Sequence, residues 1–177
     1  MDIFQRIAAE MRTQCEVLVS KMDGVDFYQY VLELVNIGHG ALPAVQAGMG
    51  HPSWRIRRGC AAVLFHLCDT ESLQRLVLLT RDPKKKVRKM AILSLGRDRY
   101  AGGENSIDAV PHLSYSALND PAVRVRRVAV LMLAAQAPQR RVVRILRKIL
   151  AAERDPKAIR VARWGLTRQQ DLSERAS

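Results

Sequence analysis

Aromatic residues are scarce in this chain and make up 5% of its 177 residues, although 48% of the residues are hydrophobic. Leucine, valine, isoleucine and alanine therefore carry the apolar load, and these residues suit helices that pack closely on helices. The three cysteines, Cys15, Cys60 and Cys68, are an odd number without a disulfide framework. They favour a reducing compartment over a secreted, disulfide-stabilised fold.

Long hydrophobic runs are also absent. The longest uncharged run, from Leu34 to Trp54, contains four glycines and two prolines, so we interpret it as loops and helix ends rather than a membrane span. The start of the chain, MDIFQRIAAEM, has no basic segment followed by an apolar block, which a secretory signal would need. We expect a soluble, cytoplasmic protein without a membrane partner.

Acidic residues are outnumbered, with 17 Asp and Glu against 29 Lys and Arg and a net charge of +12. Residues 1–50 contain three basic and six acidic residues, whereas residues 51–177 contain 26 basic and 11 acidic ones. A basic excess in one part of a chain indicates an anionic partner, such as nucleic acid, a membrane surface or an acidic protein. The alternative is that these residues only form helices and keep the surface solvated.

One short phrase recurs along the basic part of the chain. It reads HPSWRIRRGCA from His51, DPKKKVRKMA from Asp82 and DPAVRVRRVA from Asp120, and a degraded copy, DPKAIRVARWG, begins at Asp155. The prolines of successive copies are 31, 38 and 35 residues apart. Self-similarity at this period predicts a solenoid of stacked repeats, and such solenoids usually work by offering a long surface to a partner.

Helical periodicity and turn residues divide the chain into pairs of helices. Residues 1–40 are expected to form an N-terminal cap with helices at 2–22 and 26–36, and residues 41–170 to form four helix pairs. Residues 98–105 are a turn-rich insertion, and residues 171–177 are a frayed tail. The pairs are expected at 41–48 with 53–67, 71–80 with 84–96, 106–118 with 122–135, and 138–152 with 157–169.

Several segments resemble HEAT repeats, especially the short bacterial kind found in the phycobilisome-lyase HEAT-like family. The resemblance covers residues 40–169 and implies an all-α fold, a right-handed α-solenoid. The family includes scaffolds, regulators, chromophore-attachment factors and nucleic-acid binders, so it does not imply one function. The residues that carry it are Ala41-Leu42-Pro43, Leu95-Gly96, Ala109-Val110-Pro111 with Leu113, and Asp120-Pro121 with Val125-Arg126 and Ala129.

Counting each copy of the phrase from its proline as zero assigns roles to positions along the second helix. Positions +4 (Ile56, Val87, Val125) and +8 (Cys60, Ala91, Ala129) are apolar or small and predict a buried seam. Position +5 is Arg57, Arg88 and Arg126. The resemblance implies that Asp82, Asp120, Arg88 and Arg126 form a structural ladder, which should be weaker in the first copy because His51 replaces the acid.

Positions +3 and +6 are basic in each copy and lie off the seam. The fourth copy fits when Lys157 is taken as zero, which puts Val161 and Gly165 in the seam and Ala162 at the ladder position. The pattern predicts a basic stripe across the second helices that could follow a phosphate backbone. Its residues are Arg55, Arg58, Lys86, Lys89, Arg124, Arg127, Arg160 and Arg163.

Two further groups of residues have open interpretations. The first helix of the fourth pair, expected at 138–152, is rich in basic residues. These residues could form a second contact surface or a polar end cap, and the sequence supports the two interpretations equally. Trp54 and Trp164 could stack on nucleic-acid bases, but we expect them to pack at the two ends of the array. The basic residues of that helix are Arg140, Arg141, Arg144, Arg147 and Lys148.

Catalytic and metal-binding signals are weak. Cys60, His66 and Cys68 match no common zinc pattern, and Asp108 with His112 is expected to be a surface pair rather than an acid–base pair. The sequence has no phosphate-binding GxxxxGK motif and no GxSxG motif. We expect no catalytic residue, no metal, no cofactor and no small-molecule substrate.

These observations favour a non-catalytic HEAT-repeat scaffold that binds nucleic acid or an acidic protein through the basic stripe. The alternative is an enzyme or enzyme accessory, such as an alkylpurine DNA glycosylase or a bilin-lyase-like factor. Those glycosylases resemble this chain in being HEAT-like, basic and aromatic-lined. They need an acidic residue in the groove, and neither second helix has one near Trp54 or Trp164.

Overall fold

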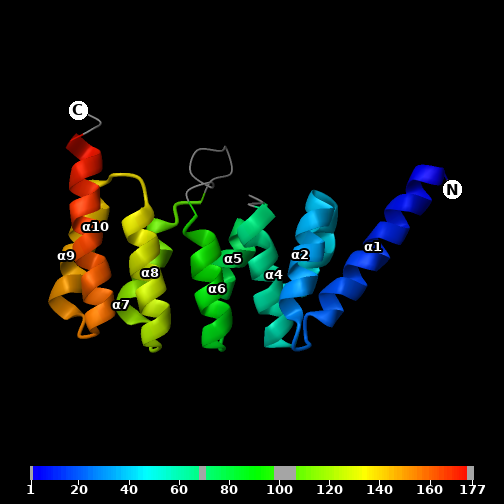
Figure 1. Ribbon diagram of the computed structural model, residues 1–177, viewed down its shortest axis with the longest axis horizontal. Helices are drawn as coiled ribbons and strands as arrows, with labels where there is room; N and C mark the ends of the chain where they lie inside the picture. Colours follow the sequence, from blue (N-terminus) through cyan, green and yellow to red (C-terminus); the bar gives the residue numbers. More distant parts are fainter. Residues whose placement is uncertain (1, 68–70, 98–106, 175–177) are drawn as a thin grey trace.

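The computed structural model describes residues 2–67, 71–97 and 107–174, and this part contains ten α-helices, one 3₁₀ helix and no strand. The all-α prediction is confirmed, and Figure 1 shows the helices side by side along the long axis, with the two termini at opposite ends. The helices are α1 (Ile3–Lys21), α2 (Phe27–Ile37), η1 (Gly38–Ala41), α3 (Leu42–Gly48), α4 (Trp54–Leu67), α5 (Leu73–Leu79), α6 (Lys85–Leu95), α7 (Val110–Asn119), α8 (Val123–Ala135), α9 (Arg140–Ala152) and α10 (Pro156–Glu174).

The helices form two layers. The even-numbered helices pack in sequence, α2 on α4, α4 on α6, α6 on α8 and α8 on α10, and α1 packs on α3 as α7 packs on α9. Helices α1 and α2 therefore take the places of a first and a second helix. The expected N-terminal cap is built as a further helix pair, although it lacks the repeated phrase.

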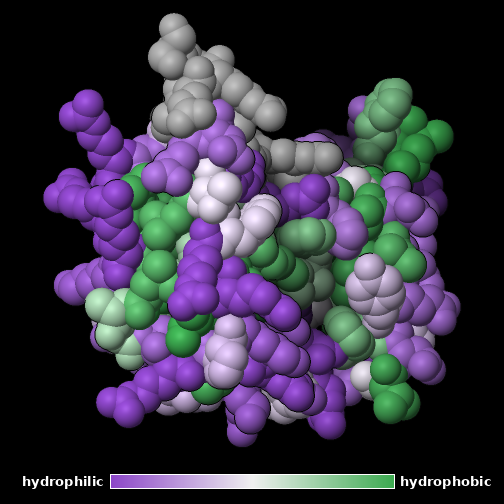
Figure 2. Space-filling view, turned by 60° about the vertical axis from the view of Figure 1, so that its left-hand side comes forward, coloured by the Kyte–Doolittle hydropathy of each residue, from purple (hydrophilic) through white to green (hydrophobic). Residues whose placement is uncertain are grey.

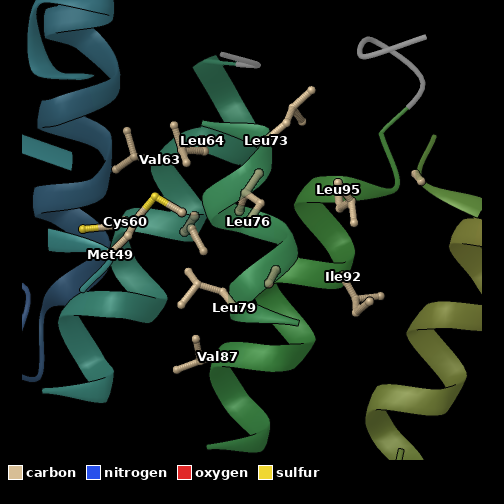
Figure 3. Close-up of a cluster of buried hydrophobic side chains, with 14 of the residues drawn as sticks. Met49, Cys60, Val63, Leu64, Leu73, Leu76, Leu79, Val87, Ile92 and Leu95 are labelled. Atoms are coloured by element: carbon tan, nitrogen blue, oxygen red, sulfur yellow. The ribbon is translucent and has the colours of Figure 1, made fainter. Parts of the chain in front are cut away.

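Leucines of the first helix α5 are buried in the core that it shares with the second helices α4 and α6. Figure 3 shows Leu73, Leu76 and Leu79 of α5 in one cluster with side chains of α4 and α6. Burying such a side chain contributes about 2 kcal/mol, so the stacked core supplies most of the stability of the array. The predicted seam of the first three copies is confirmed, because each member is at most 2% exposed: Ile56, Cys60, Val87, Ala91, Val125 and Ala129.

Arginines at position +5 link each repeat to the next. Arg57 binds Asp82 with an Nε–Oδ2 distance of 2.6 Å, and Arg88 binds Asp120 at 2.7 Å. In both pairs a second guanidinium nitrogen donates to the other carboxylate oxygen. Arg57 makes a full rung because it donates forward to Asp82. At the first copy itself the place of the acid is taken by His51, whose ring accepts the Ser53 N–H instead.

The last rung shows that position zero of the fourth copy is not Lys157, as the sequence analysis assumed. Arg126 binds Glu153 at 2.7 Å, so Glu153 occupies the place of Asp82 and Asp120, and position zero is Arg154. Positions +4 and +8 then become Ala158 and Ala162, which are both fully buried. The predicted register of the fourth copy is wrong by three residues, although Gly165 is buried and Val161 is partly buried. The Asp155-Pro156 dipeptide misled the alignment, because it copies the phrase two residues too late.

A second ladder joins the C-terminal ends of the second helices. Arg97 donates to the carbonyl oxygen of Phe65 at 2.8 Å, and Arg168 donates to that of Ala134 at 2.7 Å. Gln136 makes the equivalent bond to the Gly96 carbonyl at 3.0 Å. The three acceptors, Phe65, Gly96 and Ala134, all lie at position +13 of their copies. These bonds satisfy carbonyl groups that a helix end would leave without a partner.

The C-terminal helix is longer than expected. Helix α10 continues to Glu174, so most of the predicted frayed tail is helical. Gln169 is fully buried and donates to the carbonyl oxygen of Gln136 at 2.8 Å. The predicted insertion at 98–105 lies outside the described residues. Within the described part, no helix is long and apolar enough to cross a membrane.

Candidate binding groove

A groove of about 440 Å³ runs over the layer of second helices and is lined by α2, α4, α6 and α8. Its apolar residues are Phe27, Tyr28, Ala62, Phe65, Met90, Leu93 and Val125. Its basic residues are Arg58, Lys85, Lys86, Lys89 and Arg124, and His66 also lines it. None of the lining residues is acidic. We call this feature the α2–α8 groove.

The repeat register explains why apolar and basic residues alternate in the groove. Positions +3, +6 and +10 lie on one face of a helix, because they are separated by three and four residues. Position +10 is Ala62 in α4 and Leu93 in α6, and both line the groove. The same position is Leu131 in α8 and Trp164 in α10, which are 38% and 50% exposed. An apolar row therefore runs beside the basic positions.

The structure brings together only part of the predicted stripe. Arg58, Lys86, Lys89 and Arg124 line the groove. Arg127 does not, and its guanidinium binds Asp155 at 2.6 Å. This hydrogen-bonded ion pair raises the pKa of Arg127 and lowers that of Asp155, so both groups stay charged and neutralise each other. The stripe is therefore interrupted at α8.

The remaining three stripe residues lie outside the groove lining. Arg55 is exposed and lies 3.8 Å from Asp23. In the corrected register Lys157 and Arg160 occupy positions +3 and +6 of α10, and both are exposed. Arg163 falls at position +9, where α8 has the buried Val130. Including Arg163 in the stripe was wrong, because it followed from the incorrect count of the fourth copy.

Arg58 is the most constrained cation of the groove. The central carbon of its guanidinium lies 3.7 Å from the centre of the Phe27 ring and 5.5 Å from that of Trp54. Its Nε–H is buried and has no hydrogen-bond acceptor among the described residues. Burial lowers the pKa of Arg58, and the neighbouring charge of Arg55 lowers it further. An anion in the groove would relieve both effects.

The two tryptophans have different surroundings. Trp54 is half-buried against the core, with the Arg55 guanidinium 5.1 Å and the Lys86 Nζ 5.0 Å from its ring centre. Cations at these distances are attracted to the face of the ring. Trp164 is 50% exposed, so the expectation that it packs like Trp54 is wrong. Trp164 lies at the end of the apolar row, where no further second helix covers it.

Sequence reasoning missed the aromatic residues of the groove. Phe27 and Tyr28 belong to α2, which we had assigned to a cap without a binding role. Phe65 lies at position +13, beyond the part of the phrase that we compared. Extending the comparison to positions +10 and +13 would have revealed the apolar row, because Ala62, Leu93, Leu131 and Trp164 align once the fourth copy is counted correctly.

Helix α9 carries a second group of cations at the C-terminal end. Arg140, Arg144, Arg147 and Lys148 are exposed and recur with helical spacing on one face. Figure 2, which brings this end forward, shows many hydrophilic side chains there, with smaller hydrophobic areas between them. The fifth cation, Arg141, donates to Asp108 at 2.8 Å. This ion pair engages Asp108 with Arg141 rather than with His112.

The other candidate chemistry finds no support among the described residues. No group of three His, Cys, Asp or Glu side chains there could hold a metal ion, and Cys68 lies outside the described part. Burial raises the pKa of the Cys60 thiol to about 12, which disfavours the thiolate that a metal needs. A second depression of about 350 Å³ contains Asp120, Arg126 and Glu153, whose charged groups already bind one another or other ladder residues.

The repeat pattern and this geometry agree with a comparison against protein families. The model described as HEAT repeats matches residues 15–96 and residues 76–167. The chain belongs to the HEAT-repeat family. The match confirms the resemblance seen in the sequence, and its first segment begins within α1, as expected if α1 and α2 form a repeat. No curated protein matches the sequence of this HEAT-repeat protein.

Solved structures show the same fold at low sequence identity. A chain of the complex of CpcE and CpcF of phycocyanin lyase from Nostoc sp. PCC7120 superposes with a TM-score of 0.77 at 17% identity, covering 86% of this chain and 98% of that one. An engineered protein gives a TM-score of 0.57 at 18% identity, with coverages of 93% and 86%. A designed armadillo repeat protein in complex with the peptide (KR)4 gives 0.52 at 17% identity, with coverages of 90% and 87%.

Proposed function

We propose that this HEAT-repeat protein is a non-catalytic binding module that holds an acidic, partly apolar segment of a protein partner in the α2–α8 groove. One observation carries the proposal: five cations surround an apolar floor, and no residue of the lining is acidic. Carboxylates of a bound segment would pair with the cations, and its apolar side chains would cover the floor. Peptide recognition in grooves typically combines charge pairs with apolar contacts in this way.

The environment of the aromatic rings favours a protein segment over nucleic acid. Proteins that hold single strands stack bases on the open faces of aromatic rings. Here the Arg58 guanidinium lies 3.7 Å from the centre of the Phe27 ring, and that of Arg97 lies 4.1 Å from the centre of the Phe65 ring. Each ring thus has a face covered by a guanidinium. In addition, the Arg127–Asp155 pair interrupts the row of cations that a phosphate backbone would follow.

Two of the similar structures are consistent with a protein partner. The phycocyanin lyase structure is a complex of CpcE with CpcF, and the designed armadillo repeat protein is in complex with the peptide (KR)4. A solenoid of this kind can therefore hold a charged peptide. Because the charges of the α2–α8 groove are positive, the complementary peptide is acidic.

The test measures fluorescence anisotropy with a labelled peptide that alternates Asp or Glu with Leu. A peptide with Gln and Asn in place of the acids, and single- and double-stranded DNA, are the matched ligands. The double variant Lys86→Glu, Lys89→Glu changes the groove, and Arg144→Glu, Lys148→Glu on α9 is the control with equal charge change. We expect the groove variant to weaken binding of the acidic peptide about tenfold or more, while the control binds nearly as well as the wild type.

Three results would overturn the proposal. Equal binding of the uncharged peptide would show that the cations do not recognise the acids. Equal loss in the two variants would show that only net charge matters. Tighter binding of DNA, lost in the groove variant, would assign the groove to nucleic acid. A Tyr28→Ser variant tests the apolar floor, because Tyr28 is 51% exposed and its replacement leaves the core intact.

The likeness to the CpcE–CpcF complex supports a second candidate, a bilin-lyase-like accessory. A bilin is a flat apolar molecule with carboxylate side chains, so an apolar floor with a basic rim also suits it. A shift in bilin absorbance on mixing, abolished by Lys86→Glu, Lys89→Glu, would favour this candidate. An alkylpurine DNA glycosylase is not supported, because the groove lining contains no acidic residue.

A further inference from the structure

Arg58 differs from the arginines around it in having no carboxylate partner. Four other arginines of the second helices each bind a carboxylate of the following repeat at 2.7 Å or less: Arg57, Arg88, Arg126 and Arg127. Arg58 forms no ion pair among the described residues, although it has the same position, +6, as Arg127. Its guanidinium therefore keeps N–H donors for a molecule bound in the groove.

Two aromatic rings hold Arg58 in place. Its guanidinium carbon lies 3.7 Å from the centre of the Phe27 ring and 5.5 Å from that of Trp54. These cation–π contacts position the group without supplying an oxygen acceptor for its N–H groups. The buried Nε–H has no acceptor among the described residues, and a buried donor without a partner costs free energy. The side chain is thus positioned in advance for an anion that the protein itself does not supply.

A lysine of the next repeat reaches the same Trp54 ring as Arg58. The Nζ of Lys86, on α6, lies 5.0 Å from the centre of that ring. Lys89 lies one turn further along α6 and lines the same groove. No acidic residue lines the groove, so nothing in its lining neutralises these three charges. We call Arg58, Lys86 and Lys89 the α4–α6 cation cluster.

We propose that the α4–α6 cation cluster recognises a phosphorylated side chain of the bound segment. This inference rests on the proposed function and adds that phosphorylation of the partner controls its binding. A carboxylate carries a single negative charge, whereas a phosphoryl group carries about −1.5 to −2 at neutral pH and has three strong acceptor oxygens. It therefore matches three cations from two helices better than one Asp or Glu does. The fork of donors on a guanidinium also fits phosphoryl oxygens.

The experiment compares three versions of the labelled acidic peptide, with serine, glutamate or phosphoserine at one central position. Fluorescence anisotropy gives the affinity of each version. We expect the wild type to bind the phosphoserine version about tenfold or more tightly than the glutamate version. Arg58→Lys keeps the charge but loses the fork, so this advantage should fall to about threefold or less. Circular dichroism of the variant should match that of the wild type.

Helix α10 offers matched controls, because it carries cations at the same positions outside the groove lining. Arg160→Lys makes the same change as Arg58→Lys at position +6, where Arg160 is exposed. Lys86→Gln tests the cluster from α6 without disturbing the core, since Lys86 is exposed, and it should also reduce the phosphoserine advantage. Lys157→Gln is its control at position +3. Both α10 variants should bind all three peptides as the wild type does.

The outcomes separate this inference from the proposed function. Equal affinity for the glutamate and phosphoserine versions would overturn the inference and leave the proposed function intact. An undiminished advantage in Arg58→Lys would also overturn it, because the phosphoryl group would then bind elsewhere. Failure of all three peptides to bind would overturn both proposals. Single-stranded DNA that binds more tightly than the phosphoserine peptide, and loses its affinity in Arg58→Lys, would assign the cluster to nucleic acid instead.

Discussion

The two ends of this solenoid expose different kinds of side chain to water. At the C-terminal end, the positions that face a following repeat have changed: Ile159 stands where the ladder arginine would be, and Arg163 replaces a buried aliphatic residue. At the N-terminal end Phe4, Ile7 and Met11, which lie three and four residues apart on α1, are apolar and exposed. Terminal repeats need polar outer faces to stay soluble. The contrast shows that charged side chains cover one end, whereas the other end leaves apolar side chains exposed to water.

Two glycines, one toward each end, differ in how closely neighbouring atoms approach them. A methyl group at Gly165 of α10 would lie 2.6 Å from Ala134 Cβ and 3.2 Å from Leu146 Cδ1. Because Ala134 cannot move without its backbone, we expect Gly165→Ala to destabilise the protein by about 3 kcal/mol, in the upper part of the range for overpacking. Urea denaturation followed by circular dichroism measures the change.

Gly40→Ala is the matched variant near the N-terminal end. Its new methyl group would meet the terminal atoms of Met11 at 3.1 and 3.2 Å, where this flexible side chain can move aside, and Ile37 Cγ2 at an ordinary contact distance of 3.6 Å. We expect a change within about 0.5 kcal/mol. If both substitutions cost the same, the expected difference in packing between the two glycine sites is wrong.

Removing a rung of the ladder near the C-terminal end should have a smaller effect. Glu153→Gln replaces the carboxylate that Arg126 binds, and we expect a loss of about 1.5 kcal/mol at neutral pH. The hydrogen bond from Arg126 lowers the pKa of Glu153 from 4.5 to about 2. A carboxylate with a lowered pKa stabilises the fold fully above its ordinary pKa and loses that effect as pH falls through the lowered value.

The stability difference between wild type and Glu153→Gln should therefore be largest above about pH 4.5 and shrink toward pH 2. Thermal melts across this range measure it. A difference that is independent of pH would show that packing, and not the ion pair, explains the loss. The N-terminal end offers no equivalent carboxylate to test, since His51 stands in the place of the acid, and Arg57 donates only to its backbone carbonyl oxygen.

The smallest effect is expected for the exposed pair between α9 and the start of α7. Arg141 and Asp108 side chains are 44% and 46% exposed, so water and salt screen their attraction. Arg141→Gln should cost about 0.3 kcal/mol, as measured for exposed ion pairs. The loss should vanish at high salt in denaturation experiments. A loss as large as that of Glu153→Gln would mean that this pair also holds the end together.

Much of the fold could be predicted because the phrase repeats the same pattern of apolar and charged positions in several copies. The seam of Ile56, Val87 and Val125 and the rung between Arg88 and Asp120 follow from residues that recur at fixed positions. The register of the fourth copy was predicted wrongly because Asp155-Pro156 resembles the start of the phrase. The acid that binds the ladder arginine is Glu153, two residues earlier. A local dipeptide carries less information than the burial of a whole helix face.

The candidate groove was harder to predict than the fold. Lysines and arginines at positions +3 and +6 located its rim, but the sequence could not show that Asp155 neutralises Arg127. That acid lies 28 residues further along the chain and in an apparent copy of the phrase. Phe27 and Tyr28 were missed for a related reason, since α2 has the position of a repeat without its sequence.

The paired ladders have a mechanical consequence. Carboxylates hold the N-terminal ends of successive second helices, and side-chain bonds to carbonyl oxygens hold their C-terminal ends. A layer of helices fastened at both edges resists fanning and shear, so the cations on its surface keep a fixed pitch. In the proposed function, this fixed spacing would favour segments whose acidic groups have a matching separation, and a segment with another spacing would have to bend to fit.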